Sequence, residues 1–255
     1  MSACAGNDDN QDPGVPPGPD PTDPTDPPTP EETSRDYDEL ANVIGAHVRG
    51  EFAIMLAAAQ ISEMQFPAGF TSTGVDAEGR NTGEGVRDGM SFAFAFHCND
   101  GTAAHTVVPC DGAAHHSHIQ LAMNGSLAVG SMAMDQVARE VDWEIRDLTL
   151  DKARFRGPDQ ASLTTSVTTE GVAATYTVNF GATYEQVRFM PNAVIPTFGT
   201  IDFTLNTERV RAGDRRVFNA SAQLVYGASG TPTILTIDGS LNYSIDLTTG
   251  VVAKL

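Results

Sequence analysis

The sequence contains very little lysine and a large excess of acidic residues. Only Lys152 and Lys254 among its 15 basic residues are lysines, whereas 33 residues are acidic, which gives a net charge of −18. Because phosphate binding requires clustered lysine and arginine, this composition argues against a nucleic-acid partner. Strong like charge also favours a soluble monomer, although it does not bear on the fold.

Familiar catalytic motifs are missing as well. The chain has no G-x-S-x-G elbow, Walker loop, dinucleotide fingerprint or H-E-x-x-H motif. The single tryptophan, Trp143, alternates with apolar neighbours and is expected in the core, and the acids Glu140, Asp142 and Glu144 share the opposite, solvated face of the same strand. We therefore predict no catalytic residues and a non-enzymatic protein.

Prolines and acids are concentrated near the N-terminus. Nine of the 15 prolines lie within residues 12–30. Proline fixes φ and removes a backbone donor, and the acids repel one another, so this segment cannot bury enough apolar surface to fold. The sequence predicts a disordered tether over residues 1–35 and a single domain over residues 36–255.

The first residues, Met1-Ser2-Ala3-Cys4, resemble the end of the lipobox of bacterial lipoproteins. Neither a charged nor an apolar signal region precedes them, so the resemblance implies that the signal peptide starts upstream of Met1. It further implies lipidation of Cys4 and a membrane association through the lipid alone. Export to the outer membrane, facing the periplasm or the cell surface, is the expected localisation.

The other two cysteines, Cys98 and Cys110, enclose a short loop. We expect them to form a disulfide, which would indicate an oxidising compartment. Two reduced cysteines in a cytosolic protein are the alternative.

Hydrophobic periodicity separates a helix from a long β region. Apolar residues recur at steps of three and four between Tyr37 and Met64, which predicts a helix capped by Thr33 or Ser34. Residues 70–89 are rich in glycine and acids and indicate a loop or a short hairpin.

From Met90 to the C-terminus the apolar period is two, with alternation at 116–134, 140–150, 161–169, 172–180, 199–209, 216–226 and 232–246. Asn124-Gly125 and Asp238-Gly239 are common hairpin dipeptides. A two-residue turn at either would place apolar side chains on the wrong face, so both are expected inside continuous strands. The prediction is a mainly β protein: a long curved antiparallel meander, an open or half barrel, with the N-terminal helix on its concave face.

Histidine is unusually concentrated, because five of the six histidines lie between His97 and His118. His116 and His118 are two residues apart on one strand and therefore share a face, about 7 Å apart at the backbone. If the flanking strands pair, His97 falls nearby, and His105 of the enclosed loop could supply a fourth nitrogen. These four histidines are the candidate ligands for Zn²⁺ or Cu²⁺. The alternative is a solvated, histidine-rich loop.

The expected architecture resembles the half-barrel-and-helix design of lipoprotein carriers, in which a hydrophobic concavity accepts acyl chains. That resemblance implies a cavity between helix and sheet. The function predicted from the sequence is an envelope-anchored binding or structural module, with an apolar small ligand or an envelope protein as its partner. A metal-binding domain is the second hypothesis and a metal-dependent hydrolase the third; apart from Zn or Cu, no cofactor is expected.

Overall fold

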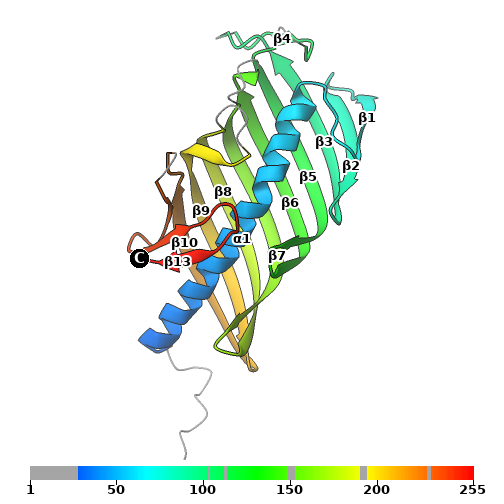
Figure 1. The fold of residues 1–255 in the computed structure, drawn as a ribbon. Coiled ribbons are helices and arrows are strands. Elements are labelled where there is room, and N and C mark those ends of the chain that lie inside the picture. Colours follow the sequence, from blue (N-terminus) through cyan, green and yellow to red (C-terminus); the bar gives the residue numbers. More distant parts are fainter. Residues whose placement is uncertain (1–27, 103, 112–113, 149–152, 190–193, 229–230) are drawn as a thin grey trace, which may run out of the picture.

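The computed structural model describes residues 28–255, except for 103, 112–113, 149–152, 190–193 and 229–230. One long helix, α1 (Pro30–Ser62), lies diagonally across one face of a large curved sheet (Figure 1). Cys4 and most of the predicted tether lie outside the described residues. Within the described part, no helix is long and apolar enough to cross a membrane.

The sheet is a 13-stranded antiparallel meander in which consecutive strands pair, except that β5 pairs with β3 and the short β4 pairs only with β3. The sheet is open, as predicted. The strands are β1 (Phe70–Val75), β2 (Asn81–Arg87), β3 (Met90–Asn99), β4 (Val107–Val108), β5 (His116–Val129), β6 (Met132–Arg146), β7 (Arg154–Thr169), β8 (Val172–Phe189), β9 (Pro196–Arg211), β10 (Asp214–Val225), β11 (Thr233–Ile237), β12 (Leu241–Ile245) and β13 (Val252–Lys254). Residues 70–89 thus form the hairpin β1–β2 rather than an irregular loop.

Helix α1 begins seven residues before the predicted Tyr37. Thr29 accepts a hydrogen bond from the Glu32 backbone N–H, and the Glu32 carboxylate accepts one from the Thr29 N–H. This capping box and the proline at the first helical position, where no N–H is needed, start the helix at Pro30. The prediction that Thr33 or Ser34 caps the helix is therefore wrong, and residues 30–35 are helical rather than part of a tether.

The concave face of the sheet is occupied by α1, as predicted (Figure 1). The helix contributes Leu40, Ile44, Val48 and Met55, all with no exposed surface. Alternate residues of the strands supply the other half of the core, and Trp143 is completely buried among them. Burial of these side chains is the main favourable contribution to docking of the helix.

The expectation of a continuous strand through Asn124-Gly125 is confirmed, because β5 runs through both residues. Gly125 has φ +149°, and a Cβ there would lie 2.2 Å from the Gly89 carbonyl oxygen. Only glycine permits this close backbone approach. The alternation predicted for 116–134 nevertheless spans two strands, since β5 ends at Val129 and β6 starts at Met132.

The same expectation is wrong at Asp238-Gly239, where the chain turns between β11 and β12. The loop has three residues, so Ile237 pairs with Leu241 and Leu235 with Tyr243. With an odd loop length the apolar side chains stay on one face, which a two-residue turn would not allow. Asp238 has a positive φ of 46° and accepts a hydrogen bond from the Ser221 backbone N–H.

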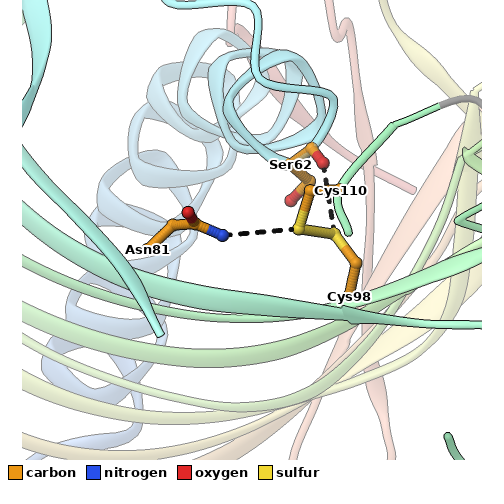
Figure 2. Close-up of a disulfide and its surroundings, with 4 residues drawn as sticks. All are labelled: Ser62, Asn81, Cys98 and Cys110. Carbon is orange, nitrogen blue, oxygen red and sulfur yellow. Dashed lines mark hydrogen bonds between the residues drawn. A yellow bond between two sulfur atoms is a disulfide. The ribbon is translucent and has the colours of Figure 1, made fainter. Parts of the chain in front are cut away.

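The predicted disulfide between Cys98 and Cys110 is present, with an S–S distance of 2.11 Å. Figure 2 shows it between the end of α1 and the sheet. Cys98 Sγ lies 3.5 Å from the Ser62 carbonyl oxygen, and the Asn81 amide donates to Cys110 Sγ over 3.6 Å. The disulfide therefore contacts the last turn of the helix as well as the loop that it closes.

Candidate functional site

Two of the four predicted metal ligands, His97 and His118, lie side by side on the face of the sheet opposite α1. They are direct partners across β3 and β5, and their ring centroids are 5.4 Å apart. His118 Nε2 lies 2.6 Å from Asp142 Oδ1 on β6. This oxygen is buried and has no other hydrogen-bond donor in the described chain, so a proton on Nε2 would satisfy it.

The other two predicted ligands lie farther away. His116 is opposite Asn99, and its Nδ1 is 3.8 Å from Glu144 Oε1. His105 is exposed on the disulfide loop with a φ of 47°. As far as the structure describes the chain, no three of these histidines and neighbouring acids place ligand atoms within 4.8 Å of one another. Within the described residues, the four histidines thus do not form a closed coordination shell.

Burial and neighbouring cations lower the pKa of two of these histidines. Partial burial and then the neighbouring His118 lower the pKa of His97. Partial burial and then Arg146 lower that of His116, against the opposing effect of Glu144. A lowered pKa keeps an imidazole neutral near pH 7, which is the form that ligates a metal or accepts a hydrogen bond.

A polar network continues from His118 across the same face. The Gln120 amide donates to Asp142 over 3.3 Å, and Gln120 Oε1 accepts from the Arg80 guanidinium at 2.8 Å. Arg80 is held in turn by Asp76, and Asp142 is the middle member of the acid row expected on this solvated face. The network connects the histidine pair to an open hollow beside it.

Three hollows, of about 530, 640 and 360 Å³, lie along this helix-free face. The first is bordered by Ala95, Gln120, Asp142 and Pro158. Strand residues line all three, and α1 lines none of them. They are therefore not the cavity between helix and sheet that the resemblance to lipoprotein carriers implies.

Sequence reasoning missed a buried charged cluster on the concave face. Arg139 Nη2 donates to Glu51 Oε1 of α1 at 3.0 Å, and Arg139 Nε donates to Asp159 Oδ1 at 3.0 Å. Tyr184 donates to Glu51, and His47 Nε2 lies 2.7 Å from Glu51 Oε1. All five side chains are buried. Although burial alone would raise the pKa of Glu51, the charges of Arg139 and His47 hold it below its usual value.

The ligand atoms of His47, Glu51 and Asp159 lie within 4.8 Å of one another, which is close enough for a metal ion. However, the Arg139 guanidinium already bonds both carboxylates and would repel a cation. We interpret the cluster as a structural connection between helix and sheet. The sequence does contain a signal for this cluster: a charged residue such as Arg139 falls at a position where strand alternation predicts an inward side chain, two residues from the apolar Val141.

A second buried cluster holds the beginning of α1. Asp36 accepts hydrogen bonds from Arg209, Arg211 and Arg216. Arg211 also donates to Glu39 at 2.6 Å. Charge pairing therefore fixes α1 to the sheet at two separate places along its length.

Comparisons with known proteins do not extend this description. No protein-family model matches the chain, and no curated protein or solved structure shows significant similarity to it.

Proposed function

We propose that this protein is a non-enzymatic binding or structural module, anchored at the cell envelope by a lipid on Cys4, which uses the helix-free face of its sheet to bind its partner. The observation that supports this proposal is the division of the two faces. The concave face is occupied by α1, whereas the three hollows and the polar network around Asp142 lie on the other face. The available binding surface combines outward carboxamide and carboxylate side chains with small apolar ones.

The anchor is tested in the native host by expression from the natural locus. We expect radiolabelled palmitate to be incorporated into the wild-type protein and the protein to fractionate with membranes. A Cys4→Ser variant should lose the label and leave the membrane fraction. An unlabelled wild-type protein with an intact Met1 would contradict the anchor. The disulfide is compatible with the oxidising compartment that this proposal requires.

The use of the helix-free face is tested by carbodiimide labelling of carboxylates. Glu140 lines the first hollow and is exposed, while Asp88 lies in the β2–β3 turn with a side chain that is 73% exposed. If the face is occupied in the envelope, Glu140 should be labelled several-fold less in intact envelopes than in purified protein. Asp88 should be labelled equally in both. Equal labelling of Glu140 would contradict the proposal.

Metal binding is the second candidate function, and the observation that favours it is the close approach of His97, His118 and Asp142. Small rotations of the side chains would direct two imidazoles and a carboxylate at one ion, which is a ligand set suited to Zn²⁺. Nothing in this site favours metal-dependent hydrolysis over simple binding.

Calorimetric titration of the untagged protein with ZnCl₂ and CuCl₂ tests this candidate. We expect stoichiometric binding that is lost in His97→Ala/His118→Ala and retained in His105→Ala, since His105 lies on the exposed loop. Unchanged stoichiometry in the double variant would exclude a site at these residues.

A further inference from the structure

The three hollows on the helix-free face adjoin one another and together make up a shallow depression. Gln160 lines all three, and Asn179 lines two of them. Together they extend over β3, β5, β6, β7, β8, β9 and β10. With neighbouring strands about 4.8 Å apart, six steps between seven strands give a length of roughly 29 Å.

Carboxamide side chains are the prominent feature of this depression, which we call the amide trough. Strand alternation turns one amide of each of several strands outward, while the residues on either side of it point into the core. Six amides line the trough: Gln120, Asn124, Gln160, Asn179, Asn206 and Asn219. Between them lie small residues such as Ala93 and Gly181, and these small residues make the surface hollow.

The central amides are available to a ligand. Asn206 and Asn219 bond each other at 2.7 Å, and Gln120 is engaged by its neighbours. For Gln160 and Asn179, in contrast, no side-chain partner is present within the described residues, and both side chains face solvent. A primary amide offers two donors and an acceptor, which suits a partner that both donates and accepts hydrogen bonds.

The charge of the lining excludes several ligand classes. Arg139 is the one basic residue among the described lining residues, and its guanidinium points into the core, with a side chain that is 3% exposed. Glu140, Asp142 and Asp238 contribute negative charge instead, so an anionic polymer would be repelled. The outward apolar side chains of the first hollow are small, namely alanines and Pro158, so this hollow has no large outward aliphatic or aromatic side chain.

We propose that the amide trough binds a neutral, polyhydroxylated polymer, that is, an uncharged glycan chain lying across the strands. The hydroxyl groups of a sugar both donate and accept, so they match the amides and can also donate to the carboxylates. The length of the trough fits an oligomer rather than a single sugar. This inference rests on the proposed use of the helix-free face and specifies the chemistry of its partner.

Affinity electrophoresis of the purified protein tests the inference. The gels contain dextran, laminarin or galactomannan as neutral glycans, and dextran sulfate or alginate as anionic ones. We expect retardation by at least one neutral glycan and none by the anionic polymers. Gln160→Ala/Asn179→Ala should weaken the binding at least tenfold, while Gln223→Ala should bind like the wild type. Gln223 is an outward amide on β10 that bonds Asp202 and does not line the hollows, so it is a matched control.

The inference is overturned if no neutral glycan retards the protein, if the anionic polymers bind more strongly, or if the double variant binds unchanged. Circular dichroism should show that all variants are folded, because the replaced side chains face solvent. Protection of Glu140 in envelopes together with a lack of glycan binding would reject the glycan while leaving the proposed function in place. Unprotected Glu140 would reject the proposed function itself.

Discussion

The most unusual side chain in the core is Arg139, a guanidinium enclosed between two carboxylates beneath the helix. Removing ions from water is unfavourable, and their mutual attraction offsets this only when the hydrogen-bond geometry is good. Here Arg139 bonds Glu51, Asp159 and Tyr184 at once. Once such a group is formed, losing one member costs more free energy than the intact group contributes.

Replacing Arg139 with methionine tests this directly. Arg139→Met keeps most of the side-chain volume but leaves Glu51 and Asp159 buried without their cation. We expect the free energy of unfolding in urea to fall by about 3–5 kcal/mol. The triple variant Glu51→Gln/Arg139→Met/Asp159→Asn should recover much of the loss.

Arg156→Met, on an exposed position of β7, should change the unfolding free energy by less than about 0.5 kcal/mol. A loss below about 1 kcal/mol for Arg139→Met would mean that the buried cluster contributes little to stability.

Among the strands, β5 is distinguished by its bend at Gly125. The conformation is left-handed and the Gly89 carbonyl lies against the position of a Cβ, so two separate effects oppose any side chain there. Gly171 also has a positive φ, of 79°, but has no atom within 4 Å of its Cβ position. Gly125 and Gly171 thus both have a positive φ, but only at Gly125 would a side chain also collide with neighbouring backbone.

Gly125→Ala should therefore destabilise the protein more than Gly171→Ala. Backbone strain alone costs about 1–3 kcal/mol, and Gly125→Ala adds the displacement of the β2–β3 turn. Thermal unfolding followed by circular dichroism measures both variants. Equal shifts in melting temperature would show that the close approach to Gly89 is readily relieved.

The two hairpin dipeptides show how far the sequence predicts these elements. Alternation identifies the buried face at both, and it correctly keeps Asn124-Gly125 within a strand. At Asp238-Gly239 it fails, because a three-residue turn preserves the buried face as well as a continuous strand does. Alternation therefore does not predict whether the chain turns at Asp238-Gly239. The pairing of Ile237 with Leu241 and of Leu235 with Tyr243 shows that it does.

The histidine site shows the same limit for side chains. Alternation predicts that His97 and His118 each point to the polar side of their own strand, and the pairing of β3 with β5 makes them direct neighbours there. His105 lies in a loop, where no regular alternation of side chains exists, so the sequence does not predict its position relative to the other histidines. The amide trough depends on strands that are distant in sequence, and their order is known only once the meander is established.

At the scale of the whole protein, four of its tyrosines are buried and Tyr37 is partly buried. Burial raises the pKa of Tyr176, Tyr184, Tyr226 and Tyr243. A hydrogen bond to Asp238 raises the pKa of Tyr37 to about 12. These are all five tyrosines of the chain.

A spectrophotometric titration at 295 nm should therefore detect little tyrosinate below about pH 11 in the folded protein, whereas the chain in guanidinium chloride should titrate near its usual value of about 10. Because the tyrosine pKa values are raised in the folded protein, the neutral tyrosines stabilise the folded state. This contribution is fully present below about pH 10 and is lost as the pH rises through the folded pKa values. Unfolding should become easier above about pH 10. Tyrosinate formation near pH 10 in folded protein would contradict the buried environment.

The two charge clusters that bind α1 to the sheet also determine the order in which the elements fold. The helix is synthesised first, but Asp36 is separated from its partner Arg216 by 180 residues and Glu51 from Arg139 by 88. The hairpins of the sheet, in contrast, join strands that follow one another directly and form from local contacts. We expect α1 to dock last, after the C-terminal strands exist. In pulse-labelled amide exchange, the sheet should accordingly gain protection before the helix. Until α1 docks, the newly made chain would expose the apolar concave face of its sheet to solvent.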